Sequence, residues 1–208
     1  FVFAGLADVL EYLEGFQLTG DDMAFLRSLG LFDKDFLAYL QGLRFTGVVK
    51  AMKEGSIFFA EEPVVEVTAP VIEAQIAETL VVNQVHFQTL LATKASRVIH
   101  ASRGRTVVDF AARRTHGTES ADRFARVSYM AGFTGTSNVL AGGRYGIPVH
   151  GTMAHSFVMT FESETDAFRA YAASFPDTST FLVVTYDTPC RPSAWTAETS
   201  SNSPSRPV

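Results

Sequence analysis

The sequence predicts an α/β fold in which an amino-terminal α+β domain precedes a second part built on a parallel sheet or barrel. One uninterrupted helical pattern, over residues 71–100, divides the chain. Before it come short helical and then short strand patterns. After it, strands alternate with helices, which is typical of parallel sheets with right-handed crossovers. We therefore place a domain boundary near Gly104 and predict domains over 1–104 and 105–188.

The composition is that of a folded protein. Of 208 residues, 47% are hydrophobic and 19% are charged, so burial can offset the entropy lost on ordering. The net charge of −5 argues against a nucleic-acid binder and a polybasic membrane-surface protein. No stretch reaches the roughly 18 uninterrupted apolar residues of a membrane span. The single cysteine, Cys190, cannot form an intrachain disulfide, which favours the cytoplasm.

Three short helices are predicted at the start of the chain. The first has an apolar face made of Leu6, Val9, Leu10 and Leu13. Thr19 and Asp22 form a capping pair ahead of the second helix. Asp33 can begin the third helix, and Gly42 ends it.

A small antiparallel sheet and a long helix come next. Glycines and a proline separate two strand patterns, Ser56–Phe59 and Val64–Thr68. The long helix has an apolar stripe made of Ile72, Ile76, Leu80, Phe87, Leu91, Ala95 and Val98. A helix of this length most simply links or braces two subdomains.

The second part has a strand-then-helix rhythm. The expected strands cover Val107–Phe110, Ile147–Val149 and Phe181–Val184, and the expected helices cover Ser120–Met130 and Thr165–Phe175. Residues 189–208 are rich in proline and serine and lack apolar periodicity, which predicts a disordered tail.

Clusters of small and polar residues follow the expected strands. They cover residues 109–117, 135–138, 151–155 and 185–188. In parallel α/β folds, ligands bind beyond the carboxyl ends of the strands, where such clusters converge. This convergence predicts an active site on one face.

Each cluster has a functional and a structural interpretation. Arg113 and Arg114 suit a phosphate or carboxylate, but an arginine pair also forms ordinary salt bridges. The small, hydroxyl-bearing run 135–138 suits an anion, although such runs are usually turns. His155 could be a general base or a nucleophile toward a phosphoryl group, whereas a lone histidine is more often structural.

The residue types give no sign of a bound metal centre. The five histidines lack an H-E-x-x-H pattern, and no cysteine pair exists for zinc. Any metal is expected to be Mg²⁺ brought by substrate phosphates, with Asp109 or Asp187 as helpers.

Three strings, in this order and spacing, resemble the nicotinate phosphoribosyltransferase family. They are VVDFAARRTHG at 107–117, AGFTGTSNVLAG at 131–142 and IPVHGTMAHSF at 147–157. The first hundred residues, including AGLADVLEYL and LRFTGVV, are also similar to the family, so the resemblance runs from about residue 3 to 188. It implies an incomplete α/β barrel of the type II phosphoribosyltransferase kind, because 105–188 is far shorter than the roughly 250 residues of a complete barrel.

The resemblance implies a reaction and its reactants. The family joins nicotinate to phosphoribosyl pyrophosphate, which gives nicotinate mononucleotide and pyrophosphate on the route to NAD. It couples this reaction to ATP hydrolysis through a phosphohistidine, which His155 matches. A homodimer is implied by analogy.

The resemblance also implies the residues that contact substrate. These are Phe110, Arg113, Arg114, Ser137, Asn138, Thr152 and Asp187. Phe110 matches a position that stacks on the pyridine ring, and Thr152 one that contacts nicotinate. At Ser137 the nicotinamide-using relative typically has aspartate, and a neutral serine avoids repelling a carboxylate.

Some departures from the family favour a rival hypothesis. Val184 stands where many members have an acid, and both the family's segment before Phe1 and its carboxy-terminal half are absent. The chain could therefore be a catalytically silent fragment or interaction module, and the tail could be a frameshift product. An aldolase would need a Schiff-base lysine at a strand end, but no lysine follows Arg97.

Overall fold

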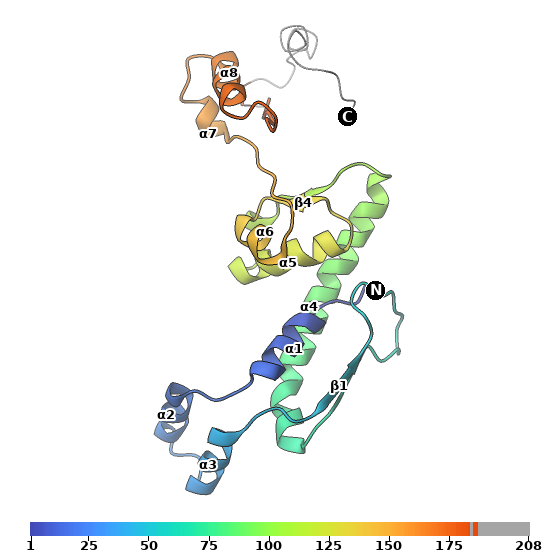
Figure 1. Cartoon of the computed structure of the whole chain (residues 1–208), viewed down its shortest axis with the longest axis vertical. Helices are drawn as coiled ribbons and strands as arrows, with labels where there is room; N and C mark the ends of the chain where they lie inside the picture. The colour runs from blue at the N-terminus through green and yellow to red at the C-terminus, as the bar shows by residue number, and fades with distance from the viewer. Residues whose placement is uncertain (184, 187–208) are drawn as a thin grey trace. The chain divides into compact units, whose positions relative to one another are not determined.

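The computed structural model describes residues 1–183, 185 and 186 (Figure 1). Its internal contacts divide the chain into two compact units, Phe1–His150 and Gly151 onward, which are described separately. Val184, Asp187 and the tail 189–208 lie outside the described residues, so the predictions made for them stay predictions.

The three predicted amino-terminal helices are confirmed. They are α1 (Leu6–Gly15), α2 (Gly20–Ser28) and α3 (Lys34–Gly42). Thr19 and Asp22 cap α2 reciprocally, each side chain bonding to the other's backbone N–H. Asp33 accepts a 2.7 Å hydrogen bond from Phe36 N at the start of α3. Sequence signals were sufficient here because each cap lies within three residues of its partner.

The antiparallel sheet is present, but one of its strands differs from the prediction. Strands β1 (Val48–Ala51) and β2 (Val65–Thr68) pair with Val48 opposite Thr68. The predicted strand Ser56–Phe59 is wrong, since Ile57 forms only an isolated bridge with Val2. The first residues of the chain take up the backbone groups there, because Phe3 N donates to Ser56 O at 2.9 Å.

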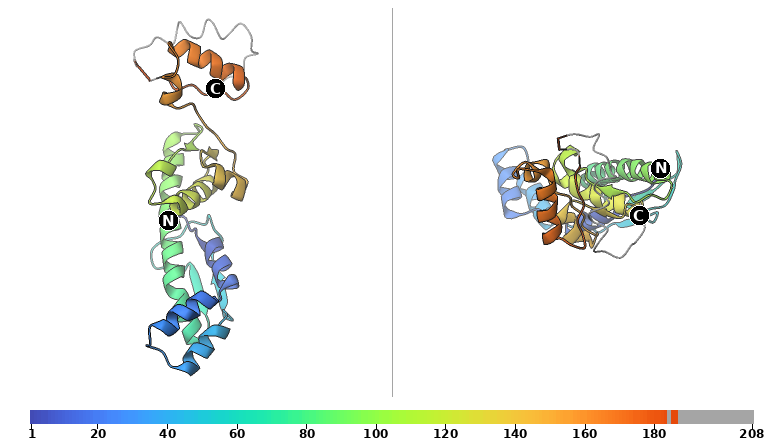
Figure 2. Two further views of the ribbon diagram at one scale, coloured as in Figure 1. Left: turned by 90° about the vertical axis from the view of Figure 1, so that its left-hand side faces the viewer. Right: turned by 90° about the horizontal axis from the view of Figure 1, so that it is seen from above.

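The long helix is confirmed as α4 (Val71–Ser102; Figure 2). Its buried stripe is not the predicted one, because Ile76 and Val98 are exposed and only Ala95 of that stripe is fully buried. The buried residues are Glu73, Ala77, Gln88, Thr89, Ala92 and Ala95. Small and polar side chains lie inward because the amino-terminal segment packs directly on the helix. A Cβ at Gly5 would lie only 2.5 Å from Gln84 O.

The second half of the first unit contains a short parallel sheet. Strands β3 (Val108–Asp109) and β4 (Gly135–Thr136) are parallel, and Val149 bridges to Thr136 in the same sense. The 3₁₀ turn η1 (Ala112–Arg114) and helix α5 (Thr118–Met130) follow β3 in the chain, and α6 (Val139–Tyr145) follows β4. The predicted strand Ile147–Val149 is thus reduced to a single bridge.

The predicted boundary near Gly104 lies inside the first compact unit. Helix α4 contacts both α1, which precedes it in the chain, and α5, which follows it. These contacts join residues before and after Gly104 in one unit. The helices of the second unit are α7 (His155–Val158) and α8 (Glu164–Ser174). The bounds of α8 differ by one residue at each end from the predicted helix Thr165–Phe175. Residues 181–183 form no strand, contrary to prediction, and Phe181 and Leu182 instead pack on the core around Phe168.

Candidate functional site

Three extended segments of the first unit end side by side, and the predicted site begins there. Ser137 N donates to Asp109 O at 2.7 Å, which ties the end of β4 to the end of β3. His150 N donates to Thr136 O at 2.9 Å, which ties the third segment to β4. The carboxyl ends therefore meet at one edge, as the sequence predicted for the clusters after residues 108 and 135.

A buried pair of side chains holds this edge together. Asp109 is only 2% exposed. Its Oδ1 accepts from Ala111 N, and its Oδ2 accepts from the Thr136 hydroxyl, both at 2.7 Å. Each oxygen thus accepts one protein hydrogen bond, and the expected help of Asp109 to a magnesium ion stays a prediction. Asp109 also fixes the turn that carries Phe110.

The predicted aromatic and cationic residues after β3 are accessible. Phe110 is 47% exposed. Arg113 and Arg114 lie in η1, and both are exposed. Neither guanidinium has an acidic partner within the described part of the chain. The salt-bridge interpretation of this arginine pair therefore has no support among these residues.

Arg114 also borders a pocket of about 340 Å³. Helices α4 and α5 form its mainly apolar walls, with Phe87 and Phe124 among the lining residues. Lys94 and His116 line it together with Arg114. Arg113 does not line it, so the two neighbouring arginines have different surroundings.

In the run 135–138, Asn138 has a structural role, whereas the Ser137 hydroxyl is available to a ligand. Asn138 Oδ1 accepts from Ala141 N at 3.2 Å and caps α6, so this predicted substrate contact has a local structural role. Ser137 is half-buried, and its hydroxyl has no hydrogen-bond partner among the residues described. Gly135 packs against the ring of His150, a residue to which the sequence gave no role. A glycine inside a strand was the signal that another group approaches closely.

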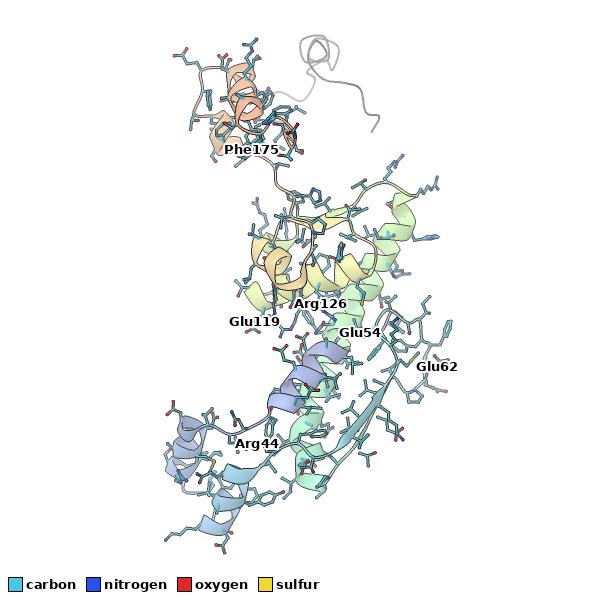
Figure 3. All side chains as sticks on the ribbon, in the orientation of Figure 1. Arg44, Glu54, Glu62, Glu119, Arg126 and Phe175 are labelled. Carbon is cyan, nitrogen blue, oxygen red and sulfur yellow. The ribbon has the colours of Figure 1, made fainter. Side chains whose placement is uncertain are left out.

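A partly buried ion pair joins the amino-terminal elements to α5 (Figure 3). Glu54 binds the Arg126 guanidinium and also accepts from the N–H groups of Gly5 and Leu6 at 2.6 and 3.0 Å. Burial disfavours the charge of Glu54, but the hydrogen bonds and Coulombic attraction of Arg126 and the two N–H donors outweigh it. The pKa of Glu54 is consequently below its ordinary value. Sequence reasoning missed this pair because its members are far apart in the chain.

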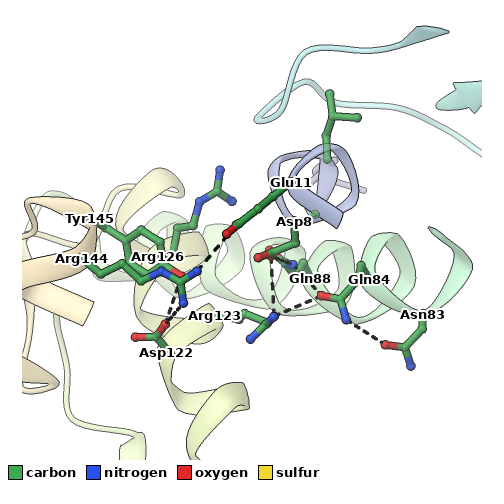
Figure 4. A network of polar contacts seen from close by, with 12 residues as sticks. Asp8, Glu11, Asn83, Gln84, Gln88, Asp122, Arg123, Arg126, Arg144 and Tyr145 are labelled. Carbon is green, nitrogen blue, oxygen red and sulfur yellow. Dashed lines mark hydrogen bonds and ion pairs between the residues drawn. The ribbon is translucent and has the colours of Figure 1, made fainter. Parts of the chain in front are cut away.

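A second polar network connects α1, α5 and α6 (Figure 4). Asp122 accepts from Arg144 at 3.2 Å and from the Tyr145 hydroxyl at 3.1 Å. Arg144 also lies 3.7 Å from Glu11. Burial, followed by the hydrogen bond to Asp122, raises the pKa of Tyr145. The network anchors the helix that follows the site loop 135–138.

The second unit holds the remaining described candidates. His155 is the first residue of α7 and is exposed, and its Nδ1 lies 3.2 Å from Thr185 Oγ1. Thr152 is exposed in the segment ahead of α7, while its neighbour Met153 is buried in the core of this unit. Sequence reasoning missed the contact with Thr185, which is distant in the chain.

Neither a metal centre nor a membrane span is found in the described part of the chain. Among residues 1–183, 185 and 186, no three His, Cys, Asp or Glu residues are grouped so as to hold a metal ion. No helix within the same residues combines the length and hydropathy required to cross a bilayer.

Two sequence profiles of one family match most of the chain. The nicotinate phosphoribosyltransferase N-terminal domain matches residues 1–86, and the nicotinate phosphoribosyltransferase family profile matches residues 106–190. The chain belongs to the nicotinate phosphoribosyltransferase family. Gly104 lies between the two matched segments. The compact units of the structure divide later, after His150.

Members of the nicotinate phosphoribosyltransferase family are similar to this chain over most of its length. A nicotinate phosphoribosyltransferase of Mycobacterium tuberculosis is 57% identical over 89% of this chain, and one of Bacillus subtilis is 45% identical over 90%. The chain spans only 40% and 38% of these relatives.

One solved structure supports the same assignment, and a second shows the fold. Human nicotinic acid phosphoribosyltransferase is 35% identical, with a TM-score of 0.71 over 77% of this chain and 33% of its own. A Pyrococcus furiosus nicotinate-nucleotide pyrophosphorylase shares the fold, with a TM-score of 0.70 and 24% identity over 89% of this chain and 41% of its own. The predicted α/β class of the type II phosphoribosyltransferase kind is therefore confirmed.

Proposed function

We propose that the chain forms the amino-terminal part of a nicotinate phosphoribosyltransferase active site. The observation that carries this proposal is the meeting of strand ends that bear Phe110 and Ser137, with the unpaired Arg113 and Arg114 in the turn that follows. The chain is 57% identical to a relative named for this activity. The proposed reaction joins nicotinate and phosphoribosyl pyrophosphate to give nicotinate mononucleotide and pyrophosphate.

The described side chains suit the two substrates. The ring nitrogen of nicotinate forms a bond to C1 of the ribose as the bond from C1 to the pyrophosphate oxygen breaks. The exposed face of Phe110 can stack on the pyridine. Arg113 and Arg114 offer guanidinium groups to the phosphate and pyrophosphate oxygens, since neither has an acidic partner among the described residues. Ser137 leaves the nicotinate carboxylate unopposed by negative charge.

His155 is proposed as the residue that ATP phosphorylates. In the tautomer whose Nδ1–H donates to Thr185 Oγ1, the lone pair of the exposed ring lies on Nε2. Nε2 can then bond to the γ-phosphorus while the bond to the bridging oxygen breaks and ADP leaves. Thr152, three residues earlier, is proposed as a contact of nicotinate.

Magnesium is proposed to arrive with the phosphates of phosphoribosyl pyrophosphate and ATP. Asp109 and Asp187 are proposed as helpers, and each oxygen of Asp109 accepts only one protein hydrogen bond and keeps a further lone pair. Mg²⁺ commonly keeps several waters and takes its other ligands from substrate phosphates. A cytoplasmic location and a homodimer remain part of the proposal.

The test is to supply the intact protein with nicotinate, phosphoribosyl pyrophosphate, ATP and Mg²⁺ and to follow nicotinate mononucleotide. We expect product, and we expect γ-labelled ATP to leave acid-labile label on the protein. His155→Ala should remove both the label and the stimulation of product formation by ATP. His86→Ala, which changes an exposed histidine on α4, is the matched control.

Folded protein that forms no mononucleotide and is not stabilised by phosphoribosyl pyrophosphate would contradict the proposal. That result would favour the rival, a catalytically silent fragment or interaction module. Stabilisation by phosphoribosyl pyrophosphate counts against the rival, because a ligand that binds the native state raises its stability. ATP stimulation that persists in His155→Ala would show that His155 has another role.

A further inference from the structure

His150 lies beside the site residues, although neither the sequence motifs nor the proposed function gives it a role. Val108 pairs with Gly135 and Asp109 with Thr136, and Val149 lies opposite Thr136. Because side chains alternate along extended segments, Asp109, Thr136 and Val149 share one face of the sheet. Phe110, Ser137 and His150, each one residue further along, share the other.

The contacts of both faces agree with this alternation. The Asp109 carboxylate bonds to the Thr136 hydroxyl on the first face. Val149 contacts α6 on that face, since a Cβ at Gly142 would lie 2.3 Å from Val149 Cγ2. On the opposite face, a Cβ at Gly135 would lie 2.3 Å from Cδ2 and 2.7 Å from Nε2 of His150. The imidazole therefore occupies the space above Gly135.

The ring is held in place but remains chemically free. His150 N donates to Thr136 O at 2.9 Å, which fixes the backbone. His150 is exposed, and its imidazole has no hydrogen-bond partner among residues 1–183, 185 and 186. An exposed, positioned ring with both nitrogens unused can serve a ligand that arrives at the strand ends.

On the face that Phe110, Ser137 and His150 share, His150 adds a hydrogen-bond donor for a bound carboxylate. Phe110 offers an aromatic surface and Ser137 one hydroxyl, whereas the Asp109 carboxylate lies on the other face. A bound carboxylate is stabilised when several donors share its charge. Imidazole supplies an N–H donor, and in its protonated form a positive charge as well.

We infer that His150 is a specificity-determining residue that donates an N–H hydrogen bond to the carboxylate of a pyridine carboxylate stacked on Phe110. The inference rests on the proposed function for the identity of the ligand. The alternative is that the ring only fills the space above Gly135. An apolar ring of similar shape distinguishes the two, because it fills the same space without a donor.

The test compares His150→Phe with His150→Asn in the 208-residue chain by calorimetric titration with nicotinate and with nicotinamide. A hydrogen bond to a charged group is worth enough that His150→Phe should weaken nicotinate binding about tenfold or more. Binding of uncharged nicotinamide should change less. His150→Asn keeps an N–H donor and should recover part of the affinity. His100→Phe, at an exposed position on α4, is the matched control and should bind as wild type does.

Each outcome supports or overturns the inference. Equal nicotinate affinity in wild type and His150→Phe, with Phe110→Ala weakened, would overturn the role of His150 and leave the proposed function standing. A wild-type chain that binds no nicotinate would overturn both. Unchanged urea midpoints for His150→Phe and His150→Asn would show that any loss of affinity is not a loss of folding. Equal losses for the two substitutions would also contradict an N–H donor role.

Discussion

Two regions of the first unit use arginine in opposite ways. Where α5 and α6 meet the amino-terminal elements, Arg123, Arg126 and Arg144 each lie within 4.0 Å of a carboxylate, on Asp8, Glu54 and Asp122 respectively. At the strand ends, Arg113 and Arg114 are exposed and have no carboxylate partner within the described residues. The first set joins separate elements of the fold, and the second is free to meet an anion.

Pairing alone does not identify a binding site. Arg97, Arg103 and Arg105 also have no acidic partner among the described residues, yet they lie near the end of α4 and in the turn after it. Arg113 and Arg114 differ because they lie three and four residues after Phe110, in the turn that follows a parallel strand ending beside β4. Position at a strand end together with missing partners is therefore the better criterion.

The largest expected contrast is between Arg126→Ala and Arg113→Ala. Arg126→Ala leaves the partly buried Glu54 carboxylate without its cation, which should cost about 3 kcal/mol of the free energy of unfolding. Arg113→Ala removes an exposed, unpaired side chain and should change that free energy by no more than about 0.5 kcal/mol. Urea unfolding followed by circular dichroism measures both.

In a ligand assay, Arg113→Ala should be the more affected of the two variants. Phosphoribosyl pyrophosphate should raise the melting temperature of Arg126→Ala above that of the same variant without ligand. It should raise that of Arg113→Ala much less than that of wild type. If Arg113→Ala destabilised the free protein as much as Arg126→Ala, the comparison between the two regions would fail.

Gly135→Ala sharpens the description of the strand-end region. The added Cβ would lie 2.3 Å from the His150 ring and 2.5 Å from Pro148 O. A backbone atom cannot move away as a flexible side chain can, so the substitution should cost about 2 kcal/mol of unfolding free energy. Gly143→Ala, where nothing lies within 4 Å, is the control. Equal unfolding free energies for the two variants would show that the close approach at Gly135 is absent.

Local patterns in the sequence predicted much of the fold. The caps of α2 and α3 were predictable because each lies within one turn of its partner, and the length of α4 because the helical pattern over residues 71–100 is uninterrupted. The buried face of α4 was not, because it depends on the amino-terminal segment bonding to Thr89 and lying against Gln84. The periodicity of apolar residues does not predict a helix face that is buried because small and polar side chains allow another backbone to approach closely.

The candidate site shows the same division. The clusters after β3 and β4 were predictable from their order along the chain, which fixes which edge of a parallel sheet they share. The roles of Asp109 and His150 were not predictable, because each depends on a neighbour more than ten residues away. Sequence suggested Asp109 as a metal helper, and its hydrogen bonds add a structural role that no local pattern indicated.

The smallest expected effect is a pH dependence that belongs to the paired region. The pKa of Glu54 is lowered in the folded protein, so its ion pair contributes stability above the unfolded-state pKa and loses it as pH falls through the folded-state pKa. Between about pH 5 and pH 3, wild type should lose about 1 kcal/mol more unfolding free energy than Glu54→Gln, which has no carboxylate to protonate. Glu66→Gln removes an exposed carboxylate 4.0 Å from Lys50 and should follow wild type. Parallel urea-unfolding curves for wild type and Glu54→Gln over this range would mean that the Glu54 charge does not hold the helices together.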